Sequence, residues 1–165
     1  MQIKFTKVSF EQFAKDFNSN NGSEKKDIDY IKDIYDNIRL PERSTTGSAG
    51  YDFFIPYDYN PTKYSNVILT GIRAIMPQDV VLQLYPRSSL GFKYGMRLVN
   101  TVGIIDSDYA NAENEGHIML KLRLEVPVSF YQGDKIVQGI FIPYYTTDDD
   151  NVTAERVGGI GSTGK

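Results

Sequence analysis

The sequence contains no cysteine, no tryptophan and a single histidine, His117. The lack of cysteine excludes a disulfide framework and a zinc site built on thiolates. One histidine excludes any site that needs two histidines from the same chain. No apolar run approaches the length of a membrane span, and the N-terminal residues lack the pattern of a signal peptide. We therefore expect a cytoplasmic protein.

The overall composition is that of one globular domain. A chain of 165 residues is long enough to bury a core, and its 41% hydrophobic and 24% charged residues are ordinary proportions. The net charge of -3 does not indicate direct binding to DNA or RNA, which usually requires a strongly basic surface.

The first 39 residues predict a strand followed by two amphipathic helices. Residues 2–8 alternate apolar and polar side chains, and Ser9 is a suitable N-cap for a helix that places Phe10, Phe13, Ala14 and Phe17 on one face. Residues 24–39 carry isoleucines at helical spacing, and Pro41 is expected to end that helix. These helices pack either on the domain or on a partner subunit.

From residue 44 onward the pattern changes to short strands separated by turns. Residues 67–76 and 80–85 predict two strands of a hairpin joined across residues 77–79, and residues 96–99 predict a further strand. Residues 116–124 alternate almost perfectly, and residues 136–142 form another apolar run. This pattern predicts an all-β barrel or sandwich with added N-terminal helices.

The stretch 86–109 holds the residues most suited to chemistry. It begins with a small polar turn that contains Arg87, Ser88 and Ser89, groups that bind phosphate oxygens. It ends with Asp106 and Asp108, where two isoleucines precede the first carboxylate. A carboxylate beside an apolar wall suits a general base. The combination indicates chemistry on a phosphate ester, although each turn by itself is compatible with a purely structural role.

Further candidates lie in and around this stretch. The Asn100 amide is suited to reading the edge of a base, and the Tyr109 ring to packing on a sugar or base. Asp52 is either a turn cap or a second acidic residue of the site. We interpret His117 as a surface or hydrogen-bonded residue rather than a ligand.

The C-terminal residues 159–165, GIGSTGK, match the first part of a P-loop. A P-loop needs a helix after it, and the sequence stops at Lys165, so we do not expect one. Two interpretations remain: a disordered terminus, or a glycine-rich arm in which Ser162 and Thr163 wrap phosphates behind Arg156.

Five motifs in order resemble those of the homotrimeric dUTPase (dUTP pyrophosphatase) family. They are residues 49–53 (AGYDF), 86–93 (PRSSLGFK), 103–109 (GIIDSDY), 133–138 (GDKIVQ) and 158–164 (GGIGSTG). The resemblance runs from about residue 40 to the end of the sequence. It implies a jelly-roll, or distorted β-barrel, that assembles into a trimer with active sites between subunits. It also implies hydrolysis of dUTP to dUMP and pyrophosphate, which limits uracil in DNA and supplies dUMP.

The resemblance also implies roles for individual residues. Asp106 matches the family's aspartate that activates the attacking water, and Tyr109 matches the residue that stacks under deoxyribose. Phosphate contacts match Arg87, Ser88, Ser89 and Gln138, and the uracil pocket matches Asn100, Gly103, Ile104, Ile105 and Met119. The closing arm matches Arg156, Ile160, Ser162 and Thr163. Asp52 is expected to contact other residues of the site rather than the substrate. Mg2+ is implied as a triphosphate chelate, without direct protein ligands.

The sequence departs from the family pattern in the arm and beside the pocket. Ile160 replaces an aromatic residue, Val157 alone separates Arg156 from Gly158, and residues 110–115 (ANAENE) are inserted. We expect an N-terminal extension over 1–39, a barrel over 40–155 and a flexible arm over 156–165. Two alternatives stay open: a dCTP deaminase-type enzyme, which would also share the barrel, and a nucleotide-responsive module that binds a protein partner through the N-terminal helices or the insertion.

Overall fold

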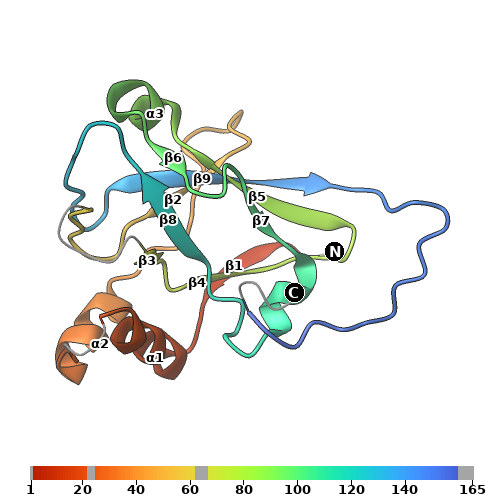
Figure 1. Cartoon of the computed structure of the whole chain (residues 1–165), viewed down its shortest axis with the longest axis horizontal. Helices are drawn as coiled ribbons and strands as arrows, with labels where there is room; N and C mark the ends of the chain where they lie inside the picture. Colours follow the sequence, from red (N-terminus) through yellow and green to blue (C-terminus); the bar gives the residue numbers. More distant parts are fainter. Residues whose placement is uncertain (1, 22–24, 62–66, 160–165) are drawn as a thin grey trace.

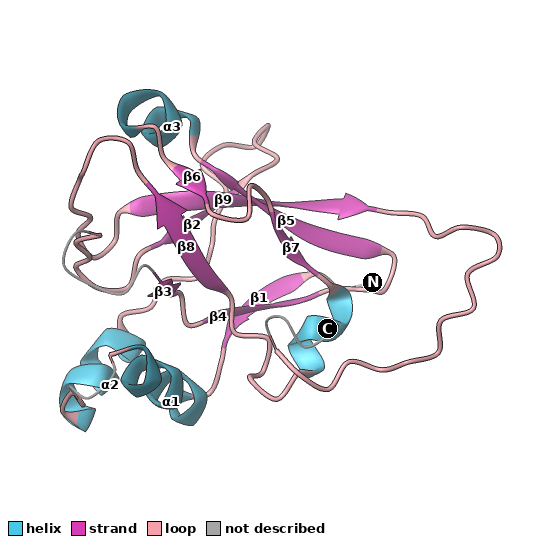
Figure 2. Ribbon diagram, in the orientation of Figure 1, coloured by secondary structure: helices cyan, strands magenta, loops and turns pink. Residues whose placement is uncertain are grey.

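The computed structural model describes residues 2–21, 25–61 and 67–159. Strands dominate this part of the chain (Figure 2), and the two longer helices come early in the sequence, after the first strand. The strands are β1 (Lys4–Lys7), β2 (Tyr51–Phe54), β3 (Val67–Leu69), β4 (Ile72–Ile75), β5 (Val80–Pro86), β6 (Arg97–Leu98), β7 (Gly103–Ile105), β8 (Met119–Arg123) and β9 (Lys135–Pro143). The helices are α1 (Phe10–Asn20), α2 (Ile28–Asp36), α3 (Ser88–Tyr94) and the 3₁₀ helix η1 (Ser107–Asn111).

The strands form small antiparallel sheets with many non-local pairings. One sheet has the order β2-β9-β5-β7, a second has the order β3-β8-β6, and β1 pairs with β4. In Figure 1, β9 of the four-stranded sheet crosses the molecule from left to right, and β3 of the three-stranded sheet lies between it and the helices at the lower left. The predicted all-β class with added N-terminal helices is confirmed. Within the described residues, no helix combines the length and apolarity that crossing a membrane would require.

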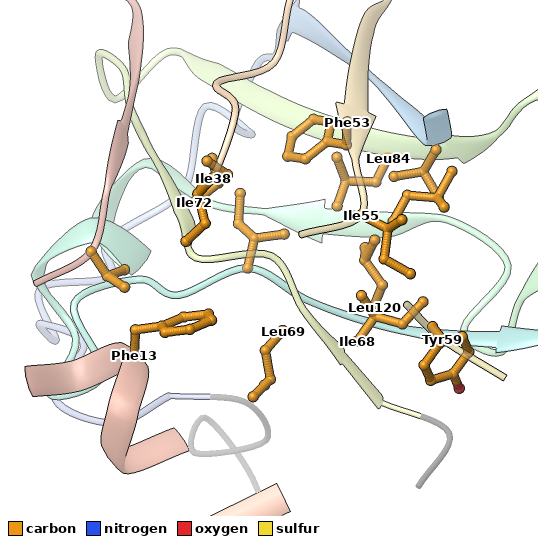
Figure 3. Close-up of a cluster of buried hydrophobic side chains, with 14 of the residues drawn as sticks. Phe13, Ile38, Phe53, Ile55, Tyr59, Ile68, Leu69, Ile72, Leu84 and Leu120 are labelled. Carbon is orange, nitrogen blue, oxygen red and sulfur yellow. The ribbon is translucent and has the colours of Figure 1, made fainter. Parts of the chain in front are cut away.

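Alternating apolar residues of the two larger sheets meet in one core. Phe53 and Leu84 come from the four-stranded sheet, Ile68 and Leu120 from the three-stranded one, and all four are buried (Figure 3). Burying such a side chain completely contributes about 1.5–3 kcal/mol of hydrophobic stabilisation. The alternation seen in residues 116–124 therefore places Leu120 inwards, while Lys121 is exposed.

Helix α1 packs against this core through its apolar face. Ser9 is its N-cap, as predicted, and the Ser9 hydroxyl accepts a hydrogen bond from the Gln12 N–H at 3.1 Å. Phe13 is fully buried and points from the helix towards the barrel core (Figure 3). Helix α2 contributes Ile31 and Ile34 to the same core. The two helices thus lie on the domain of their own chain.

Helix α2 is shorter than the predicted span 24–39. It begins after Asp27, whose carboxylate accepts a hydrogen bond from the Asp29 N–H, and it ends at Asp36. Asn37 terminates it by donating its side-chain amide to the Asp33 carbonyl oxygen at 2.9 Å. The helix therefore stops before Pro41 is reached, and local capping rather than the proline sets its end.

The predicted hairpin over residues 67–85 is wrong. Strand β4 pairs with β1, and β5 pairs with β9 and β7. Gly71 separates β3 from β4 with a φ of +70°, and a Cβ atom there would come within 2.3 Å of Ile38 Cδ1. Glycine is favoured there, because a side chain would be strained at that φ and would have to displace Ile38. The real partners of β4 and β5 lie far away in the sequence, which a local turn pattern does not reveal.

The polar turn predicted at residues 86–91 is also only partly right. Arg87 is extended, but Ser88 begins the short helix α3, which ends where Gly95 adopts a left-handed conformation. Residues 96–99 contain the two-residue strand β6, as expected of that run. After β5 the chain therefore forms the short helix α3, then strand β6, and then strand β7.

Candidate active site

Strand β7 places the predicted base-reading residues on one wall of a cavity. Its Gly103 lies opposite Leu84 of β5, and a Cβ atom at Gly103 would come within 3.0 Å of the Leu84 Cβ. The close approach explains the small residue, because a side chain there would push the two strands apart. The turn before β7 is closed by a hydrogen bond from the Val102 N–H to the Asn100 carbonyl at 2.8 Å.

The cavity has a volume of about 260 Å³. This is slightly below the roughly 300–1,000 Å³ usual for small-molecule sites, so it suits a small group such as a nucleoside. Its lining comprises Leu84, Leu98, Asn100, Gly103, Ile104, Ile105, Asp106, Tyr109, Met119, Leu120, Lys121 and Arg156. The structure thus brings together eight residues that the sequence predicted for the site: Asn100, Gly103, Ile104, Ile105, Asp106, Tyr109, Met119 and Arg156.

Arg156 lies over the acidic turn. Its Nη2 atom is 2.6 Å from Asp106 Oδ2, and its Nε atom is 2.9 Å from Asp108 Oδ1. The Arg156 side chain is 14% exposed, whereas both carboxylates are 50% exposed. The arm segment therefore reaches the predicted catalytic carboxylate, despite the short spacing between Arg156 and Gly158.

Tyr109 is a buried wall of the cavity. Its hydroxyl donates to the His117 carbonyl oxygen at 2.9 Å and accepts from Asn114 Nδ2 at 2.8 Å. Burial raises the pKa of this hydroxyl above its ordinary value, so it stays protonated and able to donate. The Arg156 guanidinium lies 5.6 Å from the centre of the Tyr109 ring, within the range of a cation–π contact.

The predicted phosphate-binding residues lie in a different part of the same chain. Arg87 and Ser88 line a separate shallow pocket beside α3, with Pro86, Gly91 and Phe92. Gln138 contacts this end of the sheet, because its side-chain amide donates to the Pro86 carbonyl oxygen at 3.3 Å. Figure 1 shows α3 and η1, the helix that follows Asp106, well apart. One chain therefore presents two separate groups of predicted site residues.

Asp52 supports the second group. Its carboxylate lies 3.0 Å from Arg87 Nε and 2.8 Å from Lys135 Nζ, and it accepts a hydrogen bond from the Ser44 hydroxyl at 2.8 Å. Desolvation is the largest influence and would raise the pKa of Asp52. The hydrogen bonds from Lys135 and Ser44 and the charge of Arg87 together outweigh it, so the pKa is lowered. Asp52 thus stays charged and holds Arg87 in place.

Replacing this carboxylate should weaken the fold in a pH-dependent way. A carboxylate whose folded pKa is depressed stabilises the protein above its unfolded pKa, about 3.9, and loses that effect as the pH falls through the folded value. We expect Asp52→Asn to lower the free energy of unfolding at pH 7, and the difference from wild type to shrink below about pH 4. Urea unfolding followed by circular dichroism between pH 3 and 7 measures it.

A suitable control is Asp148→Asn. Asp148 is exposed, so its replacement should change the free energy of unfolding little at pH 7. A difference between Asp52→Asn and wild type that stays constant down to pH 3 would contradict the ion-pair explanation.

Two sets of predicted residues remain, those of the arm and His117. Ile160, Ser162 and Thr163 lie outside the described residues. His117 was predicted to be a surface or hydrogen-bonded residue. It is fully buried, so the surface alternative is wrong, and it is hydrogen-bonded at both ring nitrogens, to Asp16 at 2.6 Å and to the Gly71 N–H at 2.9 Å. Sequence reasoning did not single out Lys135 or Asn114, whose contacts depend on chain segments that are distant or tightly turned.

The described residues contain no group of three or more acidic or histidine side chains arranged to hold a metal ion. The two carboxylates at the cavity, Asp106 and Asp108, both face Arg156. Their contacts are those of ion-paired carboxylates, and the donor set is not that of a dedicated protein cage for a divalent cation.

Comparison with known proteins gives a consistent result. The family model described as dUTPase matches residues 36–164. The chain is 41% identical over 134 residues to the deoxyuridine 5'-triphosphate nucleotidohydrolase of Lactococcus lactis. The matched region covers 77% of this chain and 89% of the relative. The chain is 34% identical over 142 residues to the protein of the same name from Clostridium tetani, covering 82% of this chain and 95% of the relative.

Solved structures show the same fold. The dUTPase of Streptococcus mutans superimposes with a TM-score of 0.64 at 30% identity, covering 88% of this chain and 98% of that one. The dUTPase of Staphylococcus bacteriophage 80alpha, with dUPNHPP, superimposes with a TM-score of 0.58 at 18% identity, covering 99% of this chain and 96% of that one. The second likeness shows fold alone, and it extends over the N-terminal residues as well.

Proposed function

Because this chain belongs to the dUTPase family, we propose that it hydrolyses dUTP to dUMP and pyrophosphate with water activated by Asp106. The observation that carries the mechanism is the cavity in which Asp106 meets a strand edge, an amide side chain and a buried aromatic ring. A base-sized pocket with one carboxylate at its mouth suits attack on the phosphate nearest the nucleoside.

Asp106 is the proposed general base. Its half-exposed carboxylate accepts a proton from a water molecule, whose oxygen attacks the α-phosphorus while the bond from that phosphorus to the bridging oxygen breaks. The bridging oxygen leaves with pyrophosphate. We propose that Arg156, which faces Asp106 and Asp108, transfers its charge-assisted hydrogen bonds to phosphate oxygens when the triphosphate is bound.

The nucleoside occupies the cavity beside β7. We propose that the Asn100 amide and the backbone of Gly103, Ile104 and Ile105 read the uracil edge, with Met119 on the far wall. A site built for the uracil 4-oxo group rejects the 4-amino group of cytosine, since a buried donor or acceptor would be left unpaired. The Tyr109 ring lies under deoxyribose and leaves no room for a 2'-hydroxyl.

The phosphates bind to the second group of residues, supplied by another subunit. Arg87, Ser88, Ser89 and Gln138 lie around α3 and Pro86, away from the cavity of their own chain. In a closed trimer the cavity of one subunit meets the α3 region of its neighbour, which yields three sites between subunits. Ser162 and Thr163 of the arm are proposed to complete the phosphate contacts, while Ile160 stands where the family has an aromatic residue over uracil.

Mg2+ is proposed to reach the site bound to the triphosphate of the substrate. Mg2+ usually keeps several waters and binds through substrate phosphates rather than an all-protein cage. When bound, the ion would neutralise charge on the triphosphate, and the chain's own residues would bind the remaining oxygens. Free nucleotides are cytoplasmic substrates, so we expect the protein to act there.

A nucleotide-specificity assay tests the function directly. Release of pyrophosphate is measured for dUTP, dTTP, dCTP and UTP, with and without Mg2+. We expect kcat/KM to be highest for dUTP by about two orders of magnitude or more, because a mismatched base leaves polar groups unpaired. Comparable rates on all four nucleotides would show that the cavity does not select uracil, and ammonia release from dCTP would identify a deaminase instead.

A further inference from the structure

The inserted segment 110–115 contacts Tyr109 directly. The side-chain amide of Asn114 donates to the Tyr109 hydroxyl at 2.8 Å, and that hydroxyl donates to the His117 carbonyl oxygen at 2.9 Å. Both partners belong to one tight turn, Asn114 to His117. The hydroxyl of this cavity-lining tyrosine is therefore held from two directions, by Asn114 of the inserted segment and by His117 just after it.

The turn fixes the direction of the Asn114 amide. Asn114 Oδ1 accepts the Gly116 N–H at 3.2 Å, so Nδ2 is left to face the tyrosine, and the His117 N–H closes the turn on the Asn114 carbonyl at 3.0 Å. Gly116 has a φ of +71°, and a Cβ atom there would come within 2.7 Å of Tyr109 O and Ala110 Cα. The absence of a side chain lets the turn lie against the Tyr109 backbone.

Helix α1 and its N-cap hold the turn at two residues that follow Asn114. Glu115 accepts hydrogen bonds from the N–H of Ser9 at 2.7 Å and from its hydroxyl at 2.5 Å. Asp16 binds His117 Nδ1 at 2.6 Å, and the other ring nitrogen accepts the Gly71 N–H at 2.9 Å. With Nε2 as an acceptor, Nδ1 carries the proton and donates to Asp16. The contacts from Ser9 and Asp16 join segments 106 and 101 residues apart and anchor residues 115 and 117.

We propose that Asn114 is a positioning residue: by fixing the Tyr109 ring in the nucleotide cavity, it sets the selectivity of the enzyme for deoxyribose over ribose. This inference rests on the proposed function, in which the Tyr109 ring lies under the sugar. A ring anchored only by packing can tilt, whereas a hydroxyl bound on two sides keeps the ring edge in one place. The added turn and α1 thus act on substrate choice without touching substrate.

The test compares Asn114→Ala and Tyr109→Phe, alone and combined. Losing one hydrogen bond of ordinary strength corresponds to roughly a threefold to tenfold change. We expect Asn114→Ala to lower the ratio of kcat/KM for dUTP to that for UTP by about this factor. The change should come through a higher KM for dUTP and a gain on UTP, with kcat for dUTP little altered. Tyr109→Phe should have the same direction.

The combined variant gives the decisive comparison. If Asn114 acts through the Tyr109 hydroxyl, Asn114→Ala has no further effect on sugar selectivity in the Tyr109→Phe background. Asn111→Ala is the matched control, since Asn111 is exposed on η1 within the same region and should leave selectivity unchanged. An equal effect of Asn114→Ala in both backgrounds would overturn the proposal, and would point to its other neighbour, Gly159 of the arm.

Binding measurements with dUMP and with UMP separate failure of this inference from failure of the proposed function. Calorimetric binding of dUMP and UMP to the same variants reports sugar selectivity without turnover, so it also applies if wild type fails to hydrolyse dUTP. Such a failure would sink the proposed function, whereas unchanged sugar selectivity in an active Asn114→Ala enzyme would sink this inference alone. If Asn114→Ala does not fold, Tyr109→Phe with full selectivity overturns the proposal by itself.

Discussion

Replacing Asp106 by asparagine is expected to abolish turnover of dUTP while leaving nucleotide binding nearly intact. The amide has almost the same shape as the carboxylate but does not accept a proton from the attacking water. General-base assistance contributes about 10²–10⁴-fold, so kcat should fall by at least about two orders of magnitude. Pyrophosphate release measures turnover, and calorimetry with an imido analogue of dUTP measures binding.

Asp108→Asn is the matched control for this substitution. Asp108 is as exposed as Asp106 and binds the same arginine, at 2.9 Å from Arg156 Nε. It does not line the cavity, so its replacement should remove one contact of the arm and leave most of the activity. Equal losses in the two variants would mean that both act through Arg156, and a fully active Asp106→Asn enzyme would remove Asp106 as the base.

Mixing two inactive variants should restore activity if sites form between subunits. One variant carries Asp106→Asn, and the other carries Ser88→Ala with Ser89→Ala in the second group of site residues. A site that takes Asp106 from one chain and the serines from another is intact in about a quarter of random 1:1 pairings in a closed trimer. We therefore expect about a quarter of wild-type activity after joint refolding, against near zero for each parent.

A second mixture serves as the control. Wild type mixed with a chain carrying all three substitutions gives about a quarter of the sites intact if they lie between subunits, but about half if each site lies within one chain. Light scattering on the same samples establishes the oligomeric state. A first mixture no more active than its parents would place both groups of residues in one site of one chain, contrary to the proposal.

Local sequence patterns were sufficient for much of the fold. The N-cap at Ser9 and the alternation of residues 116–124 depend on neighbours a few positions away. The N-cap is confirmed, and the alternation is confirmed over β8, Met119–Arg123, but not at His117, which is buried. The hairpin over residues 67–85 failed because the partners of its strands are β1 and β9, and pairing at such separation is decided by the whole core. Helix α3 was missed because its serines and glycine also suit a turn.

The sequence predicted some residues of the site and missed others. Asp106, Asn100 and Tyr109 were found because their side chains suit the chemistry, and the structure places all three around one cavity. Asn114 had no comparable signal, since its contact with Tyr109 arises from a turn that depends on Gly116 and on helix α1. The separation of Arg87 from Asp106 was likewise invisible, because twenty residues of sequence do not fix a distance.

The contacts of helix α1 show that the N-terminal residues belong to the same folding unit as the barrel. The family match starts at residue 36, yet Asp16 satisfies the ring of the fully buried His117, and Phe13 fills part of the barrel core. Removing helix α1 would leave the buried His117 N–H without its acceptor and would create an apolar cavity where Phe13 packs. Each of these changes is a recognised cause of large destabilisation. The first residue of the family match therefore lies inside the folding unit, and the residues before it are needed for the stability of the barrel.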